Sequence, residues 1–257
     1  MKWGLCCFSA KNKKLEIVTH EILTPKSDHL IVMLHEGLGS VKMWRDFPET
    51  LANKLKISTL CFSRFNYGDS DFHEAPYDVD FMHKEAELLA SLIQQISTKK
   101  IFLLGHSDGA SIALLAGLKM KNIEGIIAIA PHIFVEKMTV DSIKNTKLFF
   151  DKQTNIERLG KFHKDPKKTF KRWSDMWLSE KFKKWNIEEE IKKIEQKTCL
   201  IQGEDDHYGS SMQIIKASEL IKAESEFHFI KNCKHSPHLE KKEELIKIIK
   251  NFIYSMV

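Results

Sequence analysis

Uniformly apolar runs of strand length alternate along the chain with longer segments whose apolar residues recur at helical spacing. Residues 30–34, 101–104 and 125–130 are the clearest of these runs. Such runs are typical of strands covered on both faces, and intervening helices imply parallel strands joined by crossover connections. The pattern therefore predicts an α/β fold with a mostly parallel central sheet and helices on both of its faces.

The same periodicities predict the remaining elements around this sheet. We expect further strands at 16–23, 57–62, 198–202 and 225–230. We expect helices at 44–55, 81–96, 110–118, 212–221 and 243–254. Residues 1–10 are apolar but short, and lysines follow at once, so we interpret them as an edge strand or a tail.

The pattern changes between residues 133 and 193, where strand signals vanish and lysines, glutamates and aromatic residues dominate. Trp173 and Trp177 are one helical turn apart, so they share a face. We expect a helical cap at 133–193, inserted into an α/β core made of 1–132 and 194–257. Most of its aromatic residues should hold the insertion together, whereas these two tryptophans are our choices for the roof of a pocket.

Composition narrows the class of protein. The 257 residues are 42% hydrophobic and 29% charged, and no apolar run approaches the ~20 residues that span a bilayer. The formal net charge of +5 comes from lysines scattered beside glutamates, without a nucleic-acid-binding motif. Five cysteines without a CxxC pattern indicate reduced thiols. We therefore expect a cytoplasmic protein with no nucleic-acid partner and no stable membrane insertion. Acylation of Cys6 or Cys7 and a homodimer stay open.

Gly105-x-Ser107-x-Gly109 joins the apolar run at 101–104 to a run of small helix formers. A strand, a tight turn and a helix are the context that a nucleophile elbow requires. The turn strains the serine backbone and crowds its neighbours, which favours glycine at both flanking positions. It also sets the Ser107 hydroxyl near a helix N-terminus, where developing negative charge is stabilised. The alternative interpretation is a surface turn with an incidental serine.

Two later strand ends carry candidate acids and bases. An acidic turn with Asp205 and Asp206 follows the first strand after the insertion, and His235 and His238 follow the last strand. The carboxyl ends of parallel strands meet at one edge of a sheet, where Ser107 also falls. Nucleophilic catalysis by serine needs a base, a group that orients it, and N–H donors for the oxyanion. The choices between the two aspartates and between the two histidines stay open on this reasoning.

Together these pieces resemble the α/β-hydrolase fold family, in its capped, esterase-like form. The resemblance extends from about residue 16 to the C-terminus. Its motifs are His35-Glu36-Gly37-Leu38-Gly39, Arg64…Gly68-Asp69-Ser70, Gly105-His106-Ser107-Asp108-Gly109, Gly203-x-x-Asp206 and Lys234-His235-Ser236-Pro237-His238. The resemblance implies that Ser107 is the nucleophile, that His235 is the base, and that Asp206, selected by its spacing from Gly203, orients the base. It implies no metal and no organic cofactor.

The resemblance also implies a function and a substrate class. A serine hydrolase that acts on carboxylic esters of small or medium acyl groups is the leading hypothesis. The fold also hosts C–C bond hydrolases, lyases and non-catalytic ligand-binding proteins, which are the alternatives. Two backbone N–H groups should form the oxyanion hole, one of Asp108 and one of the first glycine loop, where Gly37 is preferred and Leu38 stays open. The residues expected to line the substrate pocket are Leu38, His132, Trp173 and Trp177.

The first glycine loop departs from the family pattern, because Glu36 stands where glycine is usual. A carboxylate beside the oxyanion would be unfavourable. We therefore expect the Glu36 side chain to point away from the site, toward Arg64 or His35. The side chain of Asp108 should also be turned away or paired, since only its backbone N–H serves the oxyanion.

Overall fold

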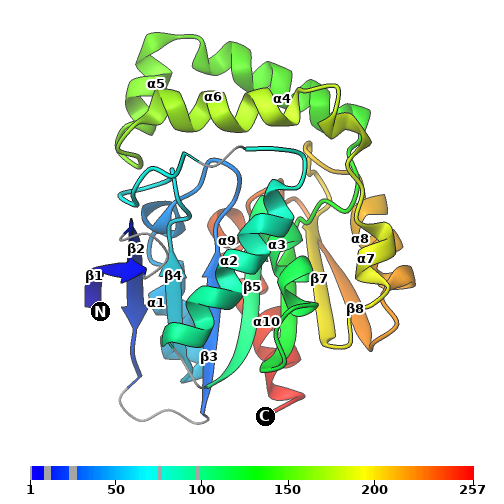
Figure 1. Ribbon diagram of the computed structural model, residues 1–257. Coiled ribbons are helices and arrows are strands. Elements are labelled where there is room, and N and C mark those ends of the chain that lie inside the picture. The colour runs from blue at the N-terminus through cyan, green and yellow to red at the C-terminus, as the bar shows by residue number, and fades with distance from the viewer. Residues whose placement is uncertain (1, 9–12, 23–27, 75–76, 97–98) are drawn as a thin grey trace.

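The computed structural model describes residues 2–8, 13–22, 28–74, 77–96 and 99–257. They contain one sheet of eight strands in the spatial order β1-β2-β4-β3-β5-β6-β7-β8 (Figure 1). The strands are β1 (Lys2–Phe8), β2 (Lys13–His20), β3 (His29–Leu34), β4 (Ser58–Phe62), β5 (Lys100–His106), β6 (Ile123–Ile129), β7 (Lys197–Gly203) and β8 (Ser225–Ile230). Strand β1 pairs antiparallel with β2, and β2 with β4, whereas all other neighbours are parallel. The predicted mostly parallel sheet is confirmed.

The N-terminal segment forms the edge strand β1, which is one of the two expectations for it. The side chains of Cys6 and Cys7, for which acylation stays open, lie outside the described side chains. The other three cysteines, Cys61, Cys199 and Cys233, are buried free thiols.

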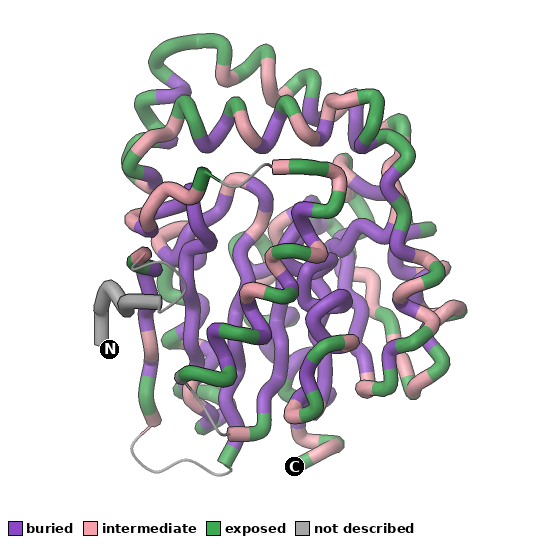
Figure 2. Tube along the Cα trace, in the orientation of Figure 1, coloured by how far each residue is buried: buried purple, intermediate pink, exposed green. Residues whose placement is uncertain are grey.

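Helices cover both faces of the sheet, because alternate side chains of each strand point to opposite sides. In β3, Leu30 and Val32 belong to one apolar core, and Ile31 and Met33 belong to the other. The first core is closed by α2 (Phe81–Ile96), α3 (Asp108–Gly117) and α8 (Met212–Leu220), and the second by α1 (Phe47–Leu55) and α10 (Lys242–Tyr254). Figure 2 shows buried residues running through the strands and the inner sides of these helices. Each fully buried aliphatic side chain contributes about 1.5–3 kcal/mol of transfer free energy.

The helix expected at 44–55 begins later than its apolar spacing suggested. A 3₁₀ turn, η1 (Val41–Trp44), comes first, and α1 starts only at Phe47. Arg45 separates the two with a positive φ of 52°. Pro48 occupies the first turn of α1, where its missing N–H costs no hydrogen bond, so the helix begins directly before this proline.

Residues 133–193 contain the helices α4 (Lys137–Phe150), α5 (Gln153–Leu159), α6 (Pro166–Trp177) and α7 (Glu188–Ile191) and the 3₁₀ turn η2 (Phe182–Lys184). Helices α4, α5 and α6 lie across the top of the sheet, whereas α7 packs beside it against α3 and α8 (Figure 1). An isolated antiparallel bridge between Phe134 and Asn186 joins the two ends of the segment. Among the described residues, no helix combines the length and the apolarity needed to cross a membrane.

Candidate active site

Ser107 lies between β5 and α3 in a strained backbone conformation, with φ 55° and ψ −121°. The flanking glycines are there because the chain is crowded. A Cβ atom on Gly105 would lie 2.2 Å from the carbonyl oxygen of Gly109, and one on Gly109 would lie 2.2 Å from that of Leu34. The N–H of Ser107 donates to the carbonyl of Ile129 in β6, which fixes the turn to the neighbouring strand. Strand, turn and helix therefore hold the Ser107 hydroxyl in one place.

His235 connects Ser107 to Asp206. Its Nε2 is 3.0 Å from Ser107 Oγ, and its Nδ1 is 3.0 and 2.9 Å from the two carboxylate oxygens of Asp206. The two residues come from the loops after β8 and β7. These loops are packed so closely that a Cβ on Gly203 would lie 2.2 Å from the carbonyl oxygens of Cys233 and Lys234. The glycine three positions before Asp206 thus lets the acid loop approach the histidine loop.

The two competing residues lie elsewhere. Asp205 is exposed, and its N–H donates to the carbonyl of Cys233. His238 is buried, with its ring 4.8 Å from the ring of Trp44 and 5.9 Å from that of Phe47. Asp206 and His235 are therefore the acid and the histidine that the structure brings to Ser107.

The electrostatics of this pair favour an ionised acid. Burial opposes ionisation of Asp206, but the imidazole of His235 and the N–H of Tyr208 outweigh it and lower the pKa of Asp206 to about 2. Burial also opposes protonation of His235, yet the carboxylate of Asp206, with smaller contributions from Glu36 and Asp108, raises its pKa above the ordinary 6.5. The carboxylate of Asp206 consequently stays charged at neutral pH and stabilises a protonated His235 when one forms.

The amides expected to hold an oxyanion border one cavity with Ser107. Asp108 is the first residue of α3, so its N–H has no partner within the helix, and Gly37 and Leu38 lie on the loop after β3. This loop is held in place by His163, which accepts from the N–H of Gly68 and donates to the carbonyl of Leu38 at 2.9 Å each. Both Gly37 and Leu38 line the cavity, and the choice between them stays open.

Glu36 does not follow the expectation that its side chain points away to Arg64 or His35. The guanidinium of Arg64 and Nδ1 of His35 donate to the backbone carbonyl of Glu36, at 3.0 and 2.7 Å. Its carboxylate instead borders the cavity beside Ser107, and its nearest basic atom is Nδ1 of His106, 3.9 Å away. The expectation was wrong because the main chain of residue 36 already uses both basic side chains.

The Asp108 carboxyl group is buried next to the cavity. Burial raises its pKa to about 6, although Arg64 and the indole N–H of Trp177 oppose the rise. No hydrogen bond of ordinary geometry reaches Asp108 Oδ2 or Trp177 Nε1 within the described part of the chain. The buried cation of Arg64 therefore offsets part of the cost of burying this carboxyl group.

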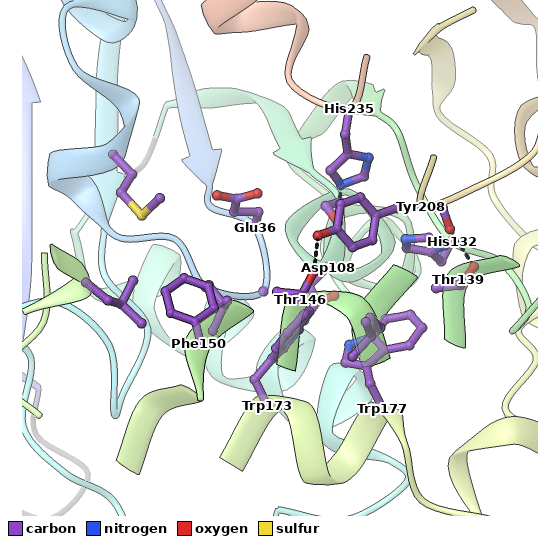
Figure 3. A pocket seen from close by; sticks show the side chains of 16 residues that line it. Glu36, Asp108, His132, Thr139, Thr146, Phe150, Trp173, Trp177, Tyr208 and His235 are labelled. Atoms are coloured by element: carbon purple, nitrogen blue, oxygen red, sulfur yellow. Dashed lines mark hydrogen bonds between the residues drawn. The ribbon is translucent and has the colours of Figure 1, made fainter. Parts of the chain in front are cut away.

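A cavity of about 210 Å³ lies between the sheet and the helices above it (Figure 3). Trp173 and Trp177 of α6 form the side opposite His235, and His132 and Leu38 also line it. Gly37 leaves room for Trp173, since a Cβ there would lie 2.1 Å from Trp173 Nε1. The lining residues that sequence reasoning did not select are Glu36, Met43, Thr139, Ile143, Thr146, Phe150, Leu159 and Tyr208.

A row of hydroxyl groups on α4 ties the insertion to the acid loop. Thr139 donates to the carbonyl of Tyr208 at 2.5 Å, Ser142 donates to that of His207 at 2.5 Å, and Thr146 Oγ1 lies 2.6 Å from the Tyr208 hydroxyl. The Tyr208 ring also lies 4.7 Å from the His235 ring. Spacings of three and four residues place the hydroxyls on one helix face, but such rows are too common to have been selected from sequence.

Comparison with known proteins places the chain in a family. A sequence model described as the alpha/beta hydrolase family matches residues 31–248, which include the two glycine loops, the elbow and both later strand ends. The chain is an alpha/beta hydrolase. Both the fold and the resemblance inferred from the motifs are thereby confirmed.

This alpha/beta hydrolase is similar to the serine hydrolase BPHL of two mammals. It is 30% identical to the Homo sapiens protein over 119 residues, which are 46% of this chain and 40% of that protein. It is 23% identical to the Mus musculus protein over 265 residues, covering 98% of this chain and 88% of that protein. A solved esterase (EaEST) from Exiguobacterium antarcticum superposes with a TM-score of 0.74 at 18% identity, covering 95% of this chain and 97% of that one. At this identity the structural likeness supports the fold alone.

Proposed function

We propose that this alpha/beta hydrolase cleaves carboxylic esters with small or medium acyl groups by nucleophilic catalysis. The observation that carries the proposal is the continuous hydrogen-bonded series from Ser107 through His235 to Asp206. The similar serine hydrolases of Homo sapiens and Mus musculus support the same reaction class.

In the proposed reaction, Nε2 of His235 accepts the proton of Ser107 as Oγ attacks the ester carbonyl. Asp206 keeps the Nδ1–H tautomer of His235, so that Nε2 presents its lone pair to the hydroxyl. The protonated His235 then gives its proton to the departing alkoxide. Water, deprotonated by His235, attacks the acyl group on Ser107 and restores the free enzyme.

The oxyanion forms at the N-terminus of α3. The N–H of Asp108 and one N–H of the loop at Gly37 or Leu38 donate to it, and the aligned peptide dipoles of α3 add to the stabilisation. Loss of one such donor typically costs about 10²–10³ in rate. The strained φ of Ser107 is what aims the Asp108 amide and the nucleophile at the same atom.

Substrate selection is assigned to the cavity beneath the insertion. Residues 133–193 act as a cap on the core of 1–132 and 194–257, since α4 and α6 contribute to the walls. The pocket residues proposed to contact the acyl group are Leu38, His132, Trp173 and Trp177. A cavity of about 210 Å³ is below the roughly 300–1,000 Å³ of sites for drug-sized ligands, which favours a short acyl chain.

An acyl-length series tests this assignment. We expect kcat/KM for p-nitrophenyl acetate and butyrate to exceed that for the laurate by at least about tenfold, because a cavity of about 210 Å³ leaves little room for a long chain. A fluorophosphonate probe should label Ser107 in the same protein preparation. Absence of both ester hydrolysis and labelling would contradict the hydrolase proposal, whereas labelling with a preference for laurate would contradict only the small-acyl assignment.

The pH dependence of the reaction follows from His235. Only the neutral imidazole accepts a proton, so kcat/KM should rise with pH as His235 loses its proton. The midpoint of this rise should lie above 6.5, because the pKa of His235 is raised. Glu36 is one of the carboxylates that raise this pKa, so Glu36→Gln should move the midpoint of the rise to lower pH. The profile is measured in buffer containing EDTA, with the exposed Glu204→Gln as a matched control that should leave it in place. A midpoint that stays or rises in Glu36→Gln contradicts the electrostatic assignment.

A further inference from the structure

Three potential metal ligands converge beside Ser107 from distant parts of the chain. Glu36 follows β3, His106 ends β5 and His235 follows β8, and each brings one ligand atom within 4.8 Å of the other two. Figure 3 shows the Glu36 carboxylate and the His235 ring on the same side of the cavity, opposite the tryptophans of α6. No spacing in the sequence indicates this cluster, because sheet order alone brings the three residues together.

The hydrogen bonds of His106 leave one ring nitrogen available. Its Nε2 is 2.7 Å from the carbonyl oxygen of His235, and a carbonyl only accepts, so Nε2 carries the proton. Its Nδ1 therefore holds a lone pair, which faces Glu36 Oε2 at 3.9 Å, and no hydrogen bond within the described residues engages it.

The other two groups are also in a form that binds a cation. The Nδ1–H of His235 donates to Asp206, so the lone pair is on Nε2, where it accepts from Ser107. A carboxylate behind a histidine is the arrangement that orients and strengthens metal-binding imidazoles. Within the described residues, the carboxylate of Glu36 makes no hydrogen bond, and one of its oxygens lies within 4.8 Å of a ring nitrogen of each histidine.

A second, smaller cavity lies next to two of the three ligands, Glu36 and His106. A small cavity of about 10 Å³, the size of one water molecule, lies between Glu36, His106 and His238, and Glu36 borders both it and the main cavity. Nδ1 of His238 is buried without a partner within the described residues. A water-sized cavity beside the ligands, bordered by Nδ1 of His238, can hold a solvent molecule next to a bound ion.

We propose that Glu36, His106 and His235 bind a divalent transition-metal ion, with Zn²⁺ the best fit, and that this ion inhibits the enzyme reversibly. Two neutral imidazoles and one carboxylate are a ligand set that Zn²⁺ takes readily, at about 2.0–2.2 Å after a small closure of the cluster. The bound ion uses the Nε2 lone pair of His235, so Ser107 loses its base. Inhibition rests on the proposed function, whereas binding of the ion does not.

Two variants remove one ligand each while keeping the local packing. His106→Gln keeps an N–H that reaches the carbonyl of His235 but lacks the Nδ1 lone pair, and Glu36→Gln removes the charge. We expect micromolar ZnSO₄ to inhibit hydrolysis of p-nitrophenyl butyrate by the wild-type chain and EDTA to restore it. Relative to its own zinc-free rate, each variant should need about tenfold or more zinc for half-inhibition.

A second cluster provides the control. Cys199, Glu226 and His228 also bring ligand atoms within 4.8 Å of one another, on β7 and β8. His228→Asn should leave zinc inhibition as in the wild type. Unchanged half-inhibition in both His106→Gln and Glu36→Gln, or its loss in His228→Asn, overturns the proposal.

Calorimetry measures zinc affinity directly, so it tests the metal site independently of ester hydrolysis. Ser107→Ala keeps all three ligands and removes the hydroxyl that competes for His235 Nε2, so it should bind Zn²⁺ at least as tightly as the wild type. Adding His106→Gln to this variant should weaken zinc binding by about tenfold or more. Zinc binding by a wild-type chain that hydrolyses no ester would refute the proposed function and leave the metal site standing. Equal zinc affinity in the single and double variants overturns the metal site.

Discussion

Ser107→Ala should lower kcat for p-nitrophenyl butyrate by about 10⁴-fold or more, down to the level that binding and the oxyanion donors alone sustain. The hydroxyl is the atom that His235 contacts at 3.0 Å, and no other hydroxyl among the described residues is hydrogen-bonded to that ring. Removing it deletes the nucleophile but leaves the cavity and the amide of Asp108 in place. Initial rates at saturating substrate, with the purified variant at high concentration, measure the loss.

The fold must stay intact for this result to be informative. Ser107 is 7% exposed, and alanine can adopt the same strained backbone conformation as serine. Ser107→Ala should therefore leave the stability of the fold unchanged, which the midpoint of thermal unfolding checks. Ser218→Ala on α8, whose hydroxyl pairs with Ser225, is the matched serine control and should keep near-wild-type activity. Retention of more than about a tenth of the wild-type kcat in Ser107→Ala would place the nucleophile at another residue.

Asp206→Asn should lower kcat by about 10⁴-fold, whereas Asp205→Asn should have little effect. The asparagine amide presents an N–H to Nδ1 of His235, which favours the tautomer with the proton on Nε2. In that tautomer His235 cannot accept the proton of Ser107. The same carboxylate also accepts from the N–H of Tyr208 at 2.8 Å, so the substitution keeps the loop contacts better than alanine would.

The adjacent pair of aspartates makes this a direct comparison. Both variants remove one charge from the same turn, so a general effect of charge on the loop would appear in both. The measurement is kcat at the pH optimum of the wild type, with thermal transitions recorded for each variant. A damaging Asp205→Asn combined with a benign Asp206→Asn would reverse the assignment of the acid.

Helix α4 is hydrogen-bonded to the loop that carries Asp206, and this contact bears on both results. Thr139, Ser142 and Thr146 of α4 bind the backbone and hydroxyl of the segment that directly follows Asp206. The position of the acid is therefore set partly by α4 and not only by β7. Displacement of α4 would disturb the contact between Asp206 and His235 without touching either side chain.

Much of the fold was predictable because its causes are local. Residues 101–104 are all apolar because their strand is covered on both faces. The residues of this one strand are enough to predict that burial. The flanking glycines of Ser107 were predictable for a similar reason, since crowding at a strand-to-helix turn follows from the turn itself. Pro48 is a sequence signal for the late start of α1. The prediction instead followed the apolar spacing, which begins at Trp44.

The site was less predictable because its contacts are long-range. The side chain of Glu36 illustrates this point. Its expected partners, Arg64 and His35, are close to it but bind its backbone carbonyl, which no pattern of side chains reveals. His106 has no metal-ligand spacing to other histidines in the sequence, although its ring contacts the backbone of His235, 129 residues later.

The sequence by itself determined the sheet with its two covered faces, the elbow at Ser107 and the two strand ends that carry Asp206 and His235. It did so because periodicity, glycine spacing and strand-end position each depend on neighbouring residues. Only the tertiary structure decided the size of the cavity, the direction of Glu36, the lone pair left on His106 and the ties between α4 and the acid loop. Those depend on packing between segments far apart in the chain, where a shift of one ångström forms or breaks a contact.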